Sequence, residues 1–195
     1  MRKAPLAYRL VYAVEYREVY RPLLKFIERD GGSVVVDVGG GYGIASEMIA
    51  NYVDKLIMVE IEPEMAIKAN ERLSKFGHAS VVMADACHLP LRDEAADTVF
   101  FFDSLHHIKE SECALREAAR VLKPWGKLAI FDFDGSKLMT KLLSLLEKAF
   151  GLWSSFYPKD ELIAILKRMG FSPDYVEGSR LGELNIVATK LPQHR

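Results

Sequence analysis

The fold of this chain is decided by the stretch Val34-Val35-Val36-Asp37-Val38-Gly39-Gly40-Gly41-Tyr42-Gly43. Its apolar, β-branched half predicts a buried strand, and residues 44–52 beyond the glycines suit a helix. A strand that leads through a glycine-rich turn into a helix forms a cradle for a ligand. The glycines fall at every second position, so the G-x-G-x-x-G spacing of dinucleotide sites is not met. The turn therefore predicts a ligand other than a nicotinamide dinucleotide.

Strand-like and helical patterns alternate after this turn. We expect strands at 33–38, 55–61, 79–84, 98–103 and 127–133, and helices at 44–52, 63–76 and 111–123. Runs that are apolar throughout, such as 98–102, are typical of parallel strands covered on both faces. The alternation predicts an α/β fold with a doubly wound, mostly parallel sheet. Its ligand site should lie beyond the carboxyl ends of the strands.

The two ends of the chain depart from this alternation. Gly31-Gly32 separates a helical arm, residues 1–32, from the main domain, residues 33–195. After the fifth strand we expect helices at 136–150 and 159–169, followed by short strands at 174–177 and 184–189. The turn between these last strands is short, which predicts that they are antiparallel.

Composition limits the classes of partner and compartment. The 195 residues are 50% hydrophobic and carry a formal net charge of −1, so a global attraction to nucleic acid is not expected. The cysteines, Cys87 and Cys113, match neither a disulfide framework nor a metal pair. No secretory signal and no membrane-spanning apolar run is seen, which favours a reducing, cytoplasmic setting.

Acidic residues end each of the expected parallel strands. Asp37 lies at the end of the first strand, Glu60 of the second, Asp85 follows the third, and Asp103 ends the fourth. The fifth strand is followed by a further pair, Asp132 and Asp134. These side chains should share the carboxyl edge of the sheet, where an acid can accept ribose hydroxyls or an adenine amino group.

These positions resemble the class I S-adenosylmethionine-dependent methyltransferases, in particular the type 11 methyltransferase domain. The family motif D/E-x-G-x-G-x-G is met by Asp37, Gly39, Gly41 and Gly43, and the resemblance is close over residues 34–132. It implies a seven-stranded sheet whose last strand is antiparallel, with S-adenosyl-L-methionine as the cofactor. One departure is Trp125, where the family has a glycine, so that turn needs a negative φ or carries strain.

The resemblance also implies a role for each residue of the edge. The turn suits the carboxylate of the cofactor, and Asp37 suits its ammonium group. Glu60 suits the ribose, Ile61 and Ala86 contact the adenine, and Asp85 accepts from its amino group. Asp103 is expected beside the cofactor and the reacting atoms.

Methyl transfer is an in-line displacement, so proximity and alignment supply much of the catalysis. His106 is a candidate general base, with Asp103 beside it; the alternative is a histidine that packs and bonds the backbone. A divalent ion held by Asp103, His106, Asp132 and Asp134 is conceivable, but generic acid spacing leads us to predict no metal.

Two helical regions are candidates for the acceptor side. Tyr8, Tyr12, Tyr16 and Tyr20 recur every fourth residue, so Tyr12 or Tyr16 could reach the acceptor from a lid. The apolar face of 136–150, within the substrate-side region 136–170, could wall the acceptor pocket, form a homodimer face or close the core. In the family this region carries substrate specificity, which favours the pocket wall.

The sequence thus predicts a methyltransferase that acts on a small, partly apolar molecule. One alternative is an RNA or protein methyltransferase, supported only by the basic arm. The motif Asn-Pro-Pro-Tyr of amino-methylating nucleic-acid enzymes is replaced by Asp103-Ser104-Leu105-His106, which disfavours an adenine or a glutamine-amide acceptor. Another alternative is a non-catalytic module that senses S-adenosylmethionine.

Overall fold

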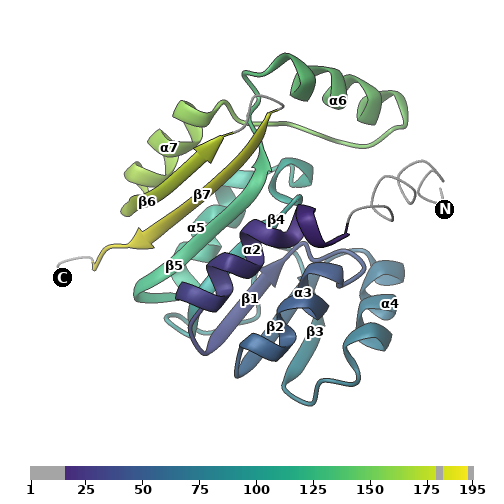
Figure 1. The fold of residues 1–195 in the computed structure, drawn as a ribbon, viewed down its shortest axis with the longest axis vertical. Coiled ribbons are helices and arrows are strands. Elements are labelled where there is room, and N and C mark those ends of the chain that lie inside the picture. Colours follow the sequence, from purple (N-terminus) through teal and green to yellow (C-terminus); the bar gives the residue numbers. More distant parts are fainter. Residues whose placement is uncertain (1–15, 179–181, 193–195) are drawn as a thin grey trace.

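The computed structural model describes residues 16–178 and 182–192. Seven strands form one sheet in the order β3-β2-β1-β4-β5-β7-β6 (Figure 1). Their bounds are β1 (Val34–Val38), β2 (Lys55–Glu60), β3 (Ala79–Met83), β4 (Ala96–Phe102), β5 (Leu122–Phe133), β6 (Phe171–Gly178) and β7 (Glu183–Lys190). The described helices are α2 (Tyr16–Asp30), α3 (Ile44–Ile49), α4 (Pro63–Leu73), α5 (Ser111–Val121), α6 (Leu138–Ala149) and α7 (Lys159–Arg168), with 3-10 turns η1 (Ala50–Tyr52) and η2 (Leu105–His107).

Strand pairing confirms the expected topology. β3, β2, β1, β4 and β5 pair in parallel, and β7 runs antiparallel to both β5 and β6. The chain reverses its strand order at β1 and β4, so the loops that follow these strands diverge and leave room at their carboxyl ends. The fold is therefore the doubly wound sheet with an antiparallel last strand that the sequence predicts.

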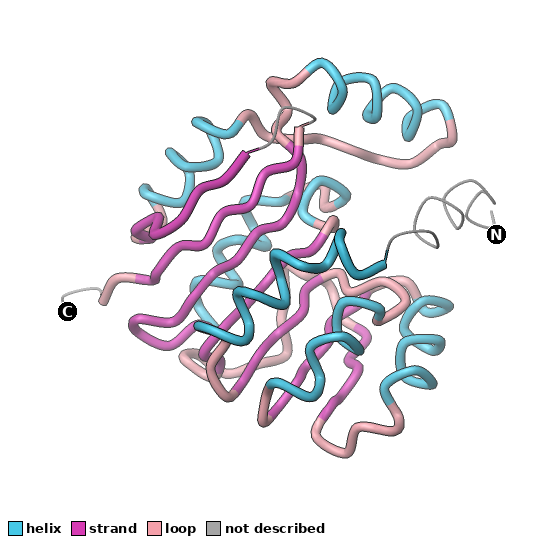
Figure 2. Tube along the Cα trace, in the orientation of Figure 1, coloured by secondary structure: helices cyan, strands magenta, loops and turns pink. Residues whose placement is uncertain are grey.

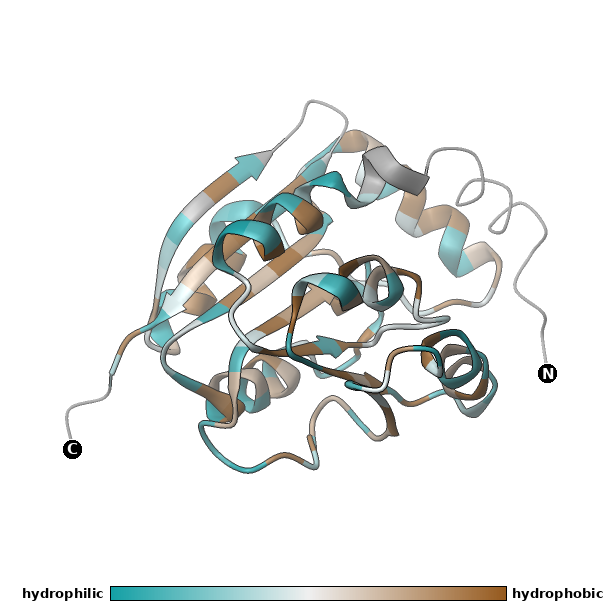
Figure 3. Ribbon diagram, turned by 60° about the horizontal axis from the view of Figure 1, so that its bottom comes forward, coloured by the Kyte–Doolittle hydropathy of each residue, from teal (hydrophilic) through white to brown (hydrophobic). Residues whose placement is uncertain are grey.

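Helices cover both faces of the sheet, as Figure 2 shows in cyan on either side of the magenta strands. One face packs on α2 and α3, with Leu23, Ile49 and Phe100 fully buried. The other face packs on α5 and α7, with Leu115, Leu128 and Leu166 fully buried. The strands are largely apolar while the covering helices carry polar residues outward (Figure 3). The sheet thus packs between two apolar layers, and its carboxyl edge lies outside both of them.

The start of β5 differs from the sequence-based expectation. A helix was expected to reach Lys123, but α5 ends at Val121 and Leu122 already pairs with Ala96. Pro124 explains the early end, because the residue before a proline disfavours the helical region. Trp125, near the start of β5, adopts φ 67°, so this position takes the strained, left-handed option.

Helix α6 is turned so that its polar face meets the protein. Thr140 and Glu147 are buried and Ser144 is half-buried, whereas the leucines of the opposite face are exposed. These exposed apolar side chains are Leu138, Met139, Leu142, Leu145 and Leu146. Figure 1 shows α6 above the end of the sheet rather than within its layers. The apolar face therefore does not close the core, which excludes one of the three expectations for residues 136–150.

Among the described residues, none of the helices combines the length and apolar character needed to span a membrane.

Candidate active site

The glycine turn after β1 forms the first wall of the candidate site. Gly39, Gly41 and Gly43 have φ values of 73°, 57° and 76°, a region that side-chain-bearing residues rarely adopt. A Cβ on Gly41 would meet no atom within 4 Å, so its backbone is open on that side. A Cβ on Gly39 would lie 2.9 Å from Cβ of Ser104, so this glycine is needed for close packing against the segment after β4. The alternate spacing therefore produces a turn with one accessible backbone position.

Asp37 lies beneath this turn and is 1% exposed. Its Oδ2 accepts a hydrogen bond of 2.7 Å from Oγ of Ser46, while its Oδ1 has no hydrogen-bond partner among the described residues. Burial raises the pKa of Asp37 to about 7; the Ser46 bond opposes this rise and the charge of Glu60 adds to it. A buried carboxyl with one unpaired oxygen is costly unless a donor or a cation reaches it. Asp37 is therefore prepared for a positively charged ligand group.

Glu60 joins the end of β2 to the glycine turn. Its Oε2 accepts the amide of Gly41 at 2.8 Å, and its Oε1 accepts the amides of Ile61 at 2.8 Å and Glu62 at 2.9 Å. Both carboxylate oxygens are therefore occupied by backbone donors. Each oxygen has further acceptor capacity, so a ribose hydroxyl can share it or replace the Gly41 amide. Ile61 follows with 57% of its surface exposed, an apolar side chain left open at the same edge.

Asp85 and Ala86 lie beside this position. The amide of Ala84 donates to the carbonyl of Glu60 at 3.1 Å, which aligns the loop after β3 with the end of β2. Oδ1 of Asp85 accepts the amide of Cys87 at 2.9 Å, and its carboxyl group is half-exposed. The structure thus brings Glu60, Ile61 and Asp85 to neighbouring strand ends, as the sequence predicts.

The segment after β4 contributes Asp103, Ser104 and His106. Asp103 has φ 51°, a left-handed conformation that is uncommon for a side-chain-bearing residue and typical of strained functional turns. Its amide donates to the carbonyl of Phe131 at 2.8 Å. Oγ of Ser104 donates to the carbonyl of Val38 at 2.7 Å and so ties this segment to the glycine turn. Sequence reasoning did not select Ser104.

His106 is 3% exposed and lies between two carboxyl groups. Its Nδ1 lies 2.8 Å from Oδ1 of Asp132, and its ring stacks on Phe156 with centroids 4.2 Å apart. Burial alone would lower the pKa of His106, but Asp132 and Glu147 outweigh it and raise the pKa to about 10. These contacts favour the structural alternative over a general base, because a histidine that holds its proton at neutral pH accepts another poorly.

Glu147 of α6 is the functional candidate that sequence reasoning missed. Its Oε1 lies 3.8 Å from Nε2 of His106, and its side chain is buried although the helix around it is exposed. Burial alone would raise the pKa of Glu147, but His106 outweighs it and holds the pKa below the ordinary value. A signal was present in the sequence, because Glu147 is the one acid between residues 136 and 150.

Two expected site residues are not described at the side-chain level. Tyr12 lies outside the described residues, and the side chain of Tyr16, the first residue of α2, is likewise outside the description. Tyr20, one turn later, is buried and stacks on Phe102 with centroids 4.6 Å apart. The described part of the arm therefore packs on the sheet, and a lid role for Tyr12 and Tyr16 stays a prediction.

Comparison with known proteins places this arrangement in a family. The methyltransferase domain family Methyltransf_11 matches residues 36–130, which include the glycine turn, Glu60, Asp85 and Asp103. Residues 36–130 of this chain are a methyltransferase domain of this family. The methyl donor that this family and fold imply is S-adenosylmethionine.

Relatives of this methyltransferase domain are moderately similar in sequence. It is 35% identical over 106 residues to a 27-O-demethylrifamycin SV methyltransferase of Amycolatopsis mediterranei, covering 52% of this chain and 39% of that protein. It is 34% identical over 134 residues to the ubiquinone/menaquinone biosynthesis C-methyltransferase UbiE of Pseudomonas savastanoi, covering 65% and 50%. The chain thus spans half or less of the length of these curated relatives.

A solved structure confirms the fold. The S-adenosylmethionine-dependent methyltransferase of Aquifex aeolicus superimposes with a TM-score of 0.73 at 21% identity, over 97% of this chain and 100% of that chain.

The residues of this methyltransferase domain fit the cofactor. The unpaired Oδ1 of Asp37 suits an ammonium group, and the open side of Gly41 leaves room for a ligand against the backbone. The exposed side chain of Ile61 suits an aromatic base, and the half-exposed carboxyl of Asp85 offers an acceptor for an amino group.

Proposed function

We propose that this chain is an S-adenosylmethionine-dependent methyltransferase whose acceptor is a small, partly apolar molecule. The observation that carries the proposal is the carboxyl edge of the sheet. There, a turn with three left-handed glycines lies against Glu60, next to the half-exposed Asp85. This edge offers an open glycine backbone at Gly41, a hydroxyl acceptor in Glu60 and an apolar side chain in Ile61. It matches a nucleoside that carries an amino acid and no phosphate.

Each cofactor group has a proposed partner in this chain. Asp37 would hold the ammonium, Glu60 the ribose hydroxyls, and Asp85 the adenine amino group between Ile61 and Ala86. Asp103 would lie near the sulfonium, because its left-handed turn follows β4 directly. The bound cofactor supplies an electrophilic methyl group, and the task of these residues is to align it with the acceptor.

The acceptor side is proposed from the surface of α6. Exposed Leu142, Leu145 and Leu146 form an apolar face on α6, which follows the carboxyl end of β5. Such a face suits a partly apolar acceptor better than a polyanion. The names of two relatives refer to rifamycin SV and to quinone biosynthesis, that is, to organic molecules rather than macromolecules. Residues 136–170 are therefore proposed as the acceptor-binding region.

His106 is proposed as a positioning residue rather than a proton acceptor. Its ring is held by Asp132 and stacked on Phe156, and its carbonyl accepts the amide of Ser155 at 2.9 Å. Replacing it would then shift the segment after β4 and move the acceptor relative to the methyl group.

The proposal is tested by methyl transfer from radiolabelled S-adenosylmethionine. The acceptor panel contains phenols, quinols, a macrolactone, total RNA and a protein extract. We expect the label in a small organic product. We also expect calorimetry to show that the protein binds S-adenosylmethionine. Label found only in RNA or protein would contradict the proposed acceptor class. Tight cofactor binding without turnover on any small acceptor would favour the sensor alternative.

A further inference from the structure

A second cluster of chemistry-bearing side chains lies between η2 and α6. His106, His107 and Glu147 each offer one ligand atom, and these atoms lie within 4.8 Å of one another. His106 and Glu147 are buried, and His107 is half-buried at the outer side of the group. We infer that these three residues form a binding site for a divalent transition metal ion of the zinc class. The inference goes beyond the proposed methyl transfer and does not depend on it.

The hydrogen bonds of both histidines leave Nε2 of each ring for a ligand, and a metal ion at His106 displaces the proton that its Nε2 carries in the metal-free protein. Nδ1 of His106 bonds to Oδ1 of Asp132 at 2.8 Å, and Nδ1 of His107 bonds to the carbonyl of Trp153 at 2.8 Å. A carbonyl only accepts, so His107 must donate from Nδ1, and its Nε2 then carries the lone pair. Metal-bound histidines commonly use this arrangement, in which a carboxylate or a carbonyl fixes one nitrogen and the metal takes the other.

The distance between His106 and Glu147 fits two ligands of one ion better than a hydrogen bond. Nε2 of His106 and Oε1 of Glu147 lie 3.8 Å apart, which is too long for a hydrogen bond. Two ligand atoms each about 2.1 Å from a tetrahedral ion lie about 3.4 Å apart. A small approach of the two side chains would therefore close on a metal ion. The two imidazole rings are themselves neighbours, with centroids 3.9 Å apart.

An unpaired buried oxygen is a second, independent observation that points to a ligand at this place. Oε2 of Glu147 is buried and has no hydrogen-bond partner among the described residues. Glu147 is 6% exposed although α6 leaves most of its leucines in solvent. The helix thus turns its one acid inward at the expense of apolar burial, which is unfavourable unless the acid gains a strong partner. A divalent cation satisfies both oxygens and explains the orientation of the helix.

The type of metal follows from the donors. Two imidazoles and one carboxylate suit zinc and its neighbours in the first transition row, with water at the remaining position. Asp132 then orients His106 through its bond to Nδ1 and does not ligate the ion. Asp103 brings a further carboxyl group within reach of His106 and Asp132, so the formal charge around the imidazoles is negative. Such surroundings attract a cation.

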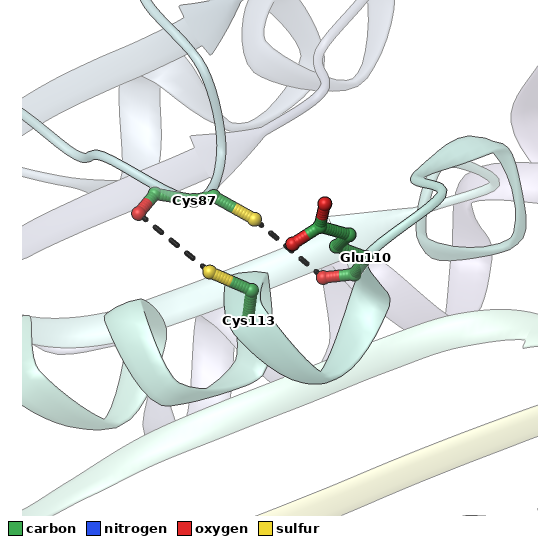
Figure 4. Close-up of side chains that lie close together, drawn as sticks. All are labelled: Cys87, Glu110 and Cys113. Carbon is green, nitrogen blue, oxygen red and sulfur yellow. Dashed lines mark hydrogen bonds between the residues drawn. The ribbon is translucent and has the colours of Figure 1, made fainter.

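A competing group contains Cys87, Glu110 and Cys113, shown in Figure 4. Sγ of Cys87 points to the carbonyl of Glu110 at 3.5 Å, and Sγ of Cys113 points to the carbonyl of Cys87 at 3.8 Å. Burial raises the pKa of the Cys87 thiol to about 12, and a protonated thiol is a poor metal ligand. This group serves as the control for the site between η2 and α6.

The inference is tested with the tag-free 195-residue chain stripped of metal by a chelator. Co²⁺ is titrated in and followed by its visible absorption, and retained Zn²⁺ is counted by mass spectrometry after equilibrium dialysis. We expect one equivalent of each ion in the wild type. Glu147→Gln keeps the shape of the side chain and His107→Asn removes one ligand, and each should weaken binding at least about tenfold.

Two control variants leave the proposed ligands in place. His88→Asn changes an exposed histidine beside Asp85, and Cys113→Ser disables the thiol group; both should bind Co²⁺ as the wild type does. Circular dichroism checks that each variant is folded. If either Glu147→Gln or His107→Asn fails to fold, the Co²⁺ affinity of the other variant tests the inference. Unchanged binding in a folded ligand variant overturns the inference. So does binding lost in Cys113→Ser, or a wild type that retains no metal.

Discussion

Oε2 of Glu60 accepts the amide of Gly41 at 2.8 Å, so the acid at the end of β2 closes the glycine turn at the end of β1. The two residues are 19 positions apart in the chain and come from adjacent parallel strands. One side chain therefore holds the open backbone position of the turn and is also the group that we propose binds the ribose. Binding of the cofactor and rigidity of the turn should thus depend on the same carboxylate.

Glu60→Ala should weaken binding of S-adenosylmethionine by about tenfold or more, because it removes charge-assisted bonds of about 1.5–3 kcal/mol. Isothermal calorimetry measures the affinity. Glu71→Ala, on the exposed surface of α4, is the matched control and should bind normally. Equal affinities of the two variants would remove Glu60 from the cofactor site.

Asp37 should make stability fall as pH rises. Its folded pKa of about 7 lies above the ordinary value of 3.8, so between these values the unfolded chain loses the proton before the folded one does. The contribution is full below pH 4 and is lost as pH approaches 7, by at most about 1.4 kcal/mol per pH unit. Urea unfolding at pH 5 and pH 7.5 measures it. Asp37→Asn should show a smaller loss over this range, and an identical loss in both proteins would contradict the assignment.

Asp132→Ala should destabilise the metal-free protein by about 3 kcal/mol. The substitution leaves His106 buried without its carboxylate partner, and breaking a buried pair costs far more than breaking an exposed one. Glu64→Ala breaks the exposed pair with Lys68 and should cost less than about 1 kcal/mol. Denaturant unfolding compares the two, and similar costs would show that the His106 contact contributes little.

Leu145→Ser should leave stability nearly unchanged and raise KM for the acceptor. The side chain is 65% exposed, so its removal exposes little new apolar surface in the folded protein. Leu166→Ala, at a fully buried position of α7, should instead cost about 2–5 kcal/mol. Melting curves and steady-state kinetics separate the two effects. A large loss of stability in Leu145→Ser would mean that α6 packs against other parts of the protein.

Trp125→Gly should stabilise the fold by about 1 kcal/mol. Trp125 adopts φ 67° near the start of β5, and glycine accepts this conformation without steric cost. The indole is 64% exposed, so little packing is lost. The urea midpoint of unfolding should rise, and a lower midpoint would show that the indole contributes more than the strain costs.

The sequence by itself determined the sheet and its cofactor edge. Strand Val34–Val38, the glycine turn and the acids Glu60 and Asp85 are local signals, because apolar runs, glycine spacing and strand-end residues act within a few positions of one another. Parallel strands then bring these ends together without further information. The family resemblance adds the identity of the cofactor.

Only the tertiary structure decided how α6 faces the protein and what surrounds His106. The leucine pattern of residues 138–149 predicts an apolar face but not which side is covered, and here the covered side is the polar one. Glu147 meets His106 across about 40 positions, a separation no local pattern encodes. The physical reason is that the covered side of a helix depends on the segments that pack against it, and only the tertiary fold brings those segments together.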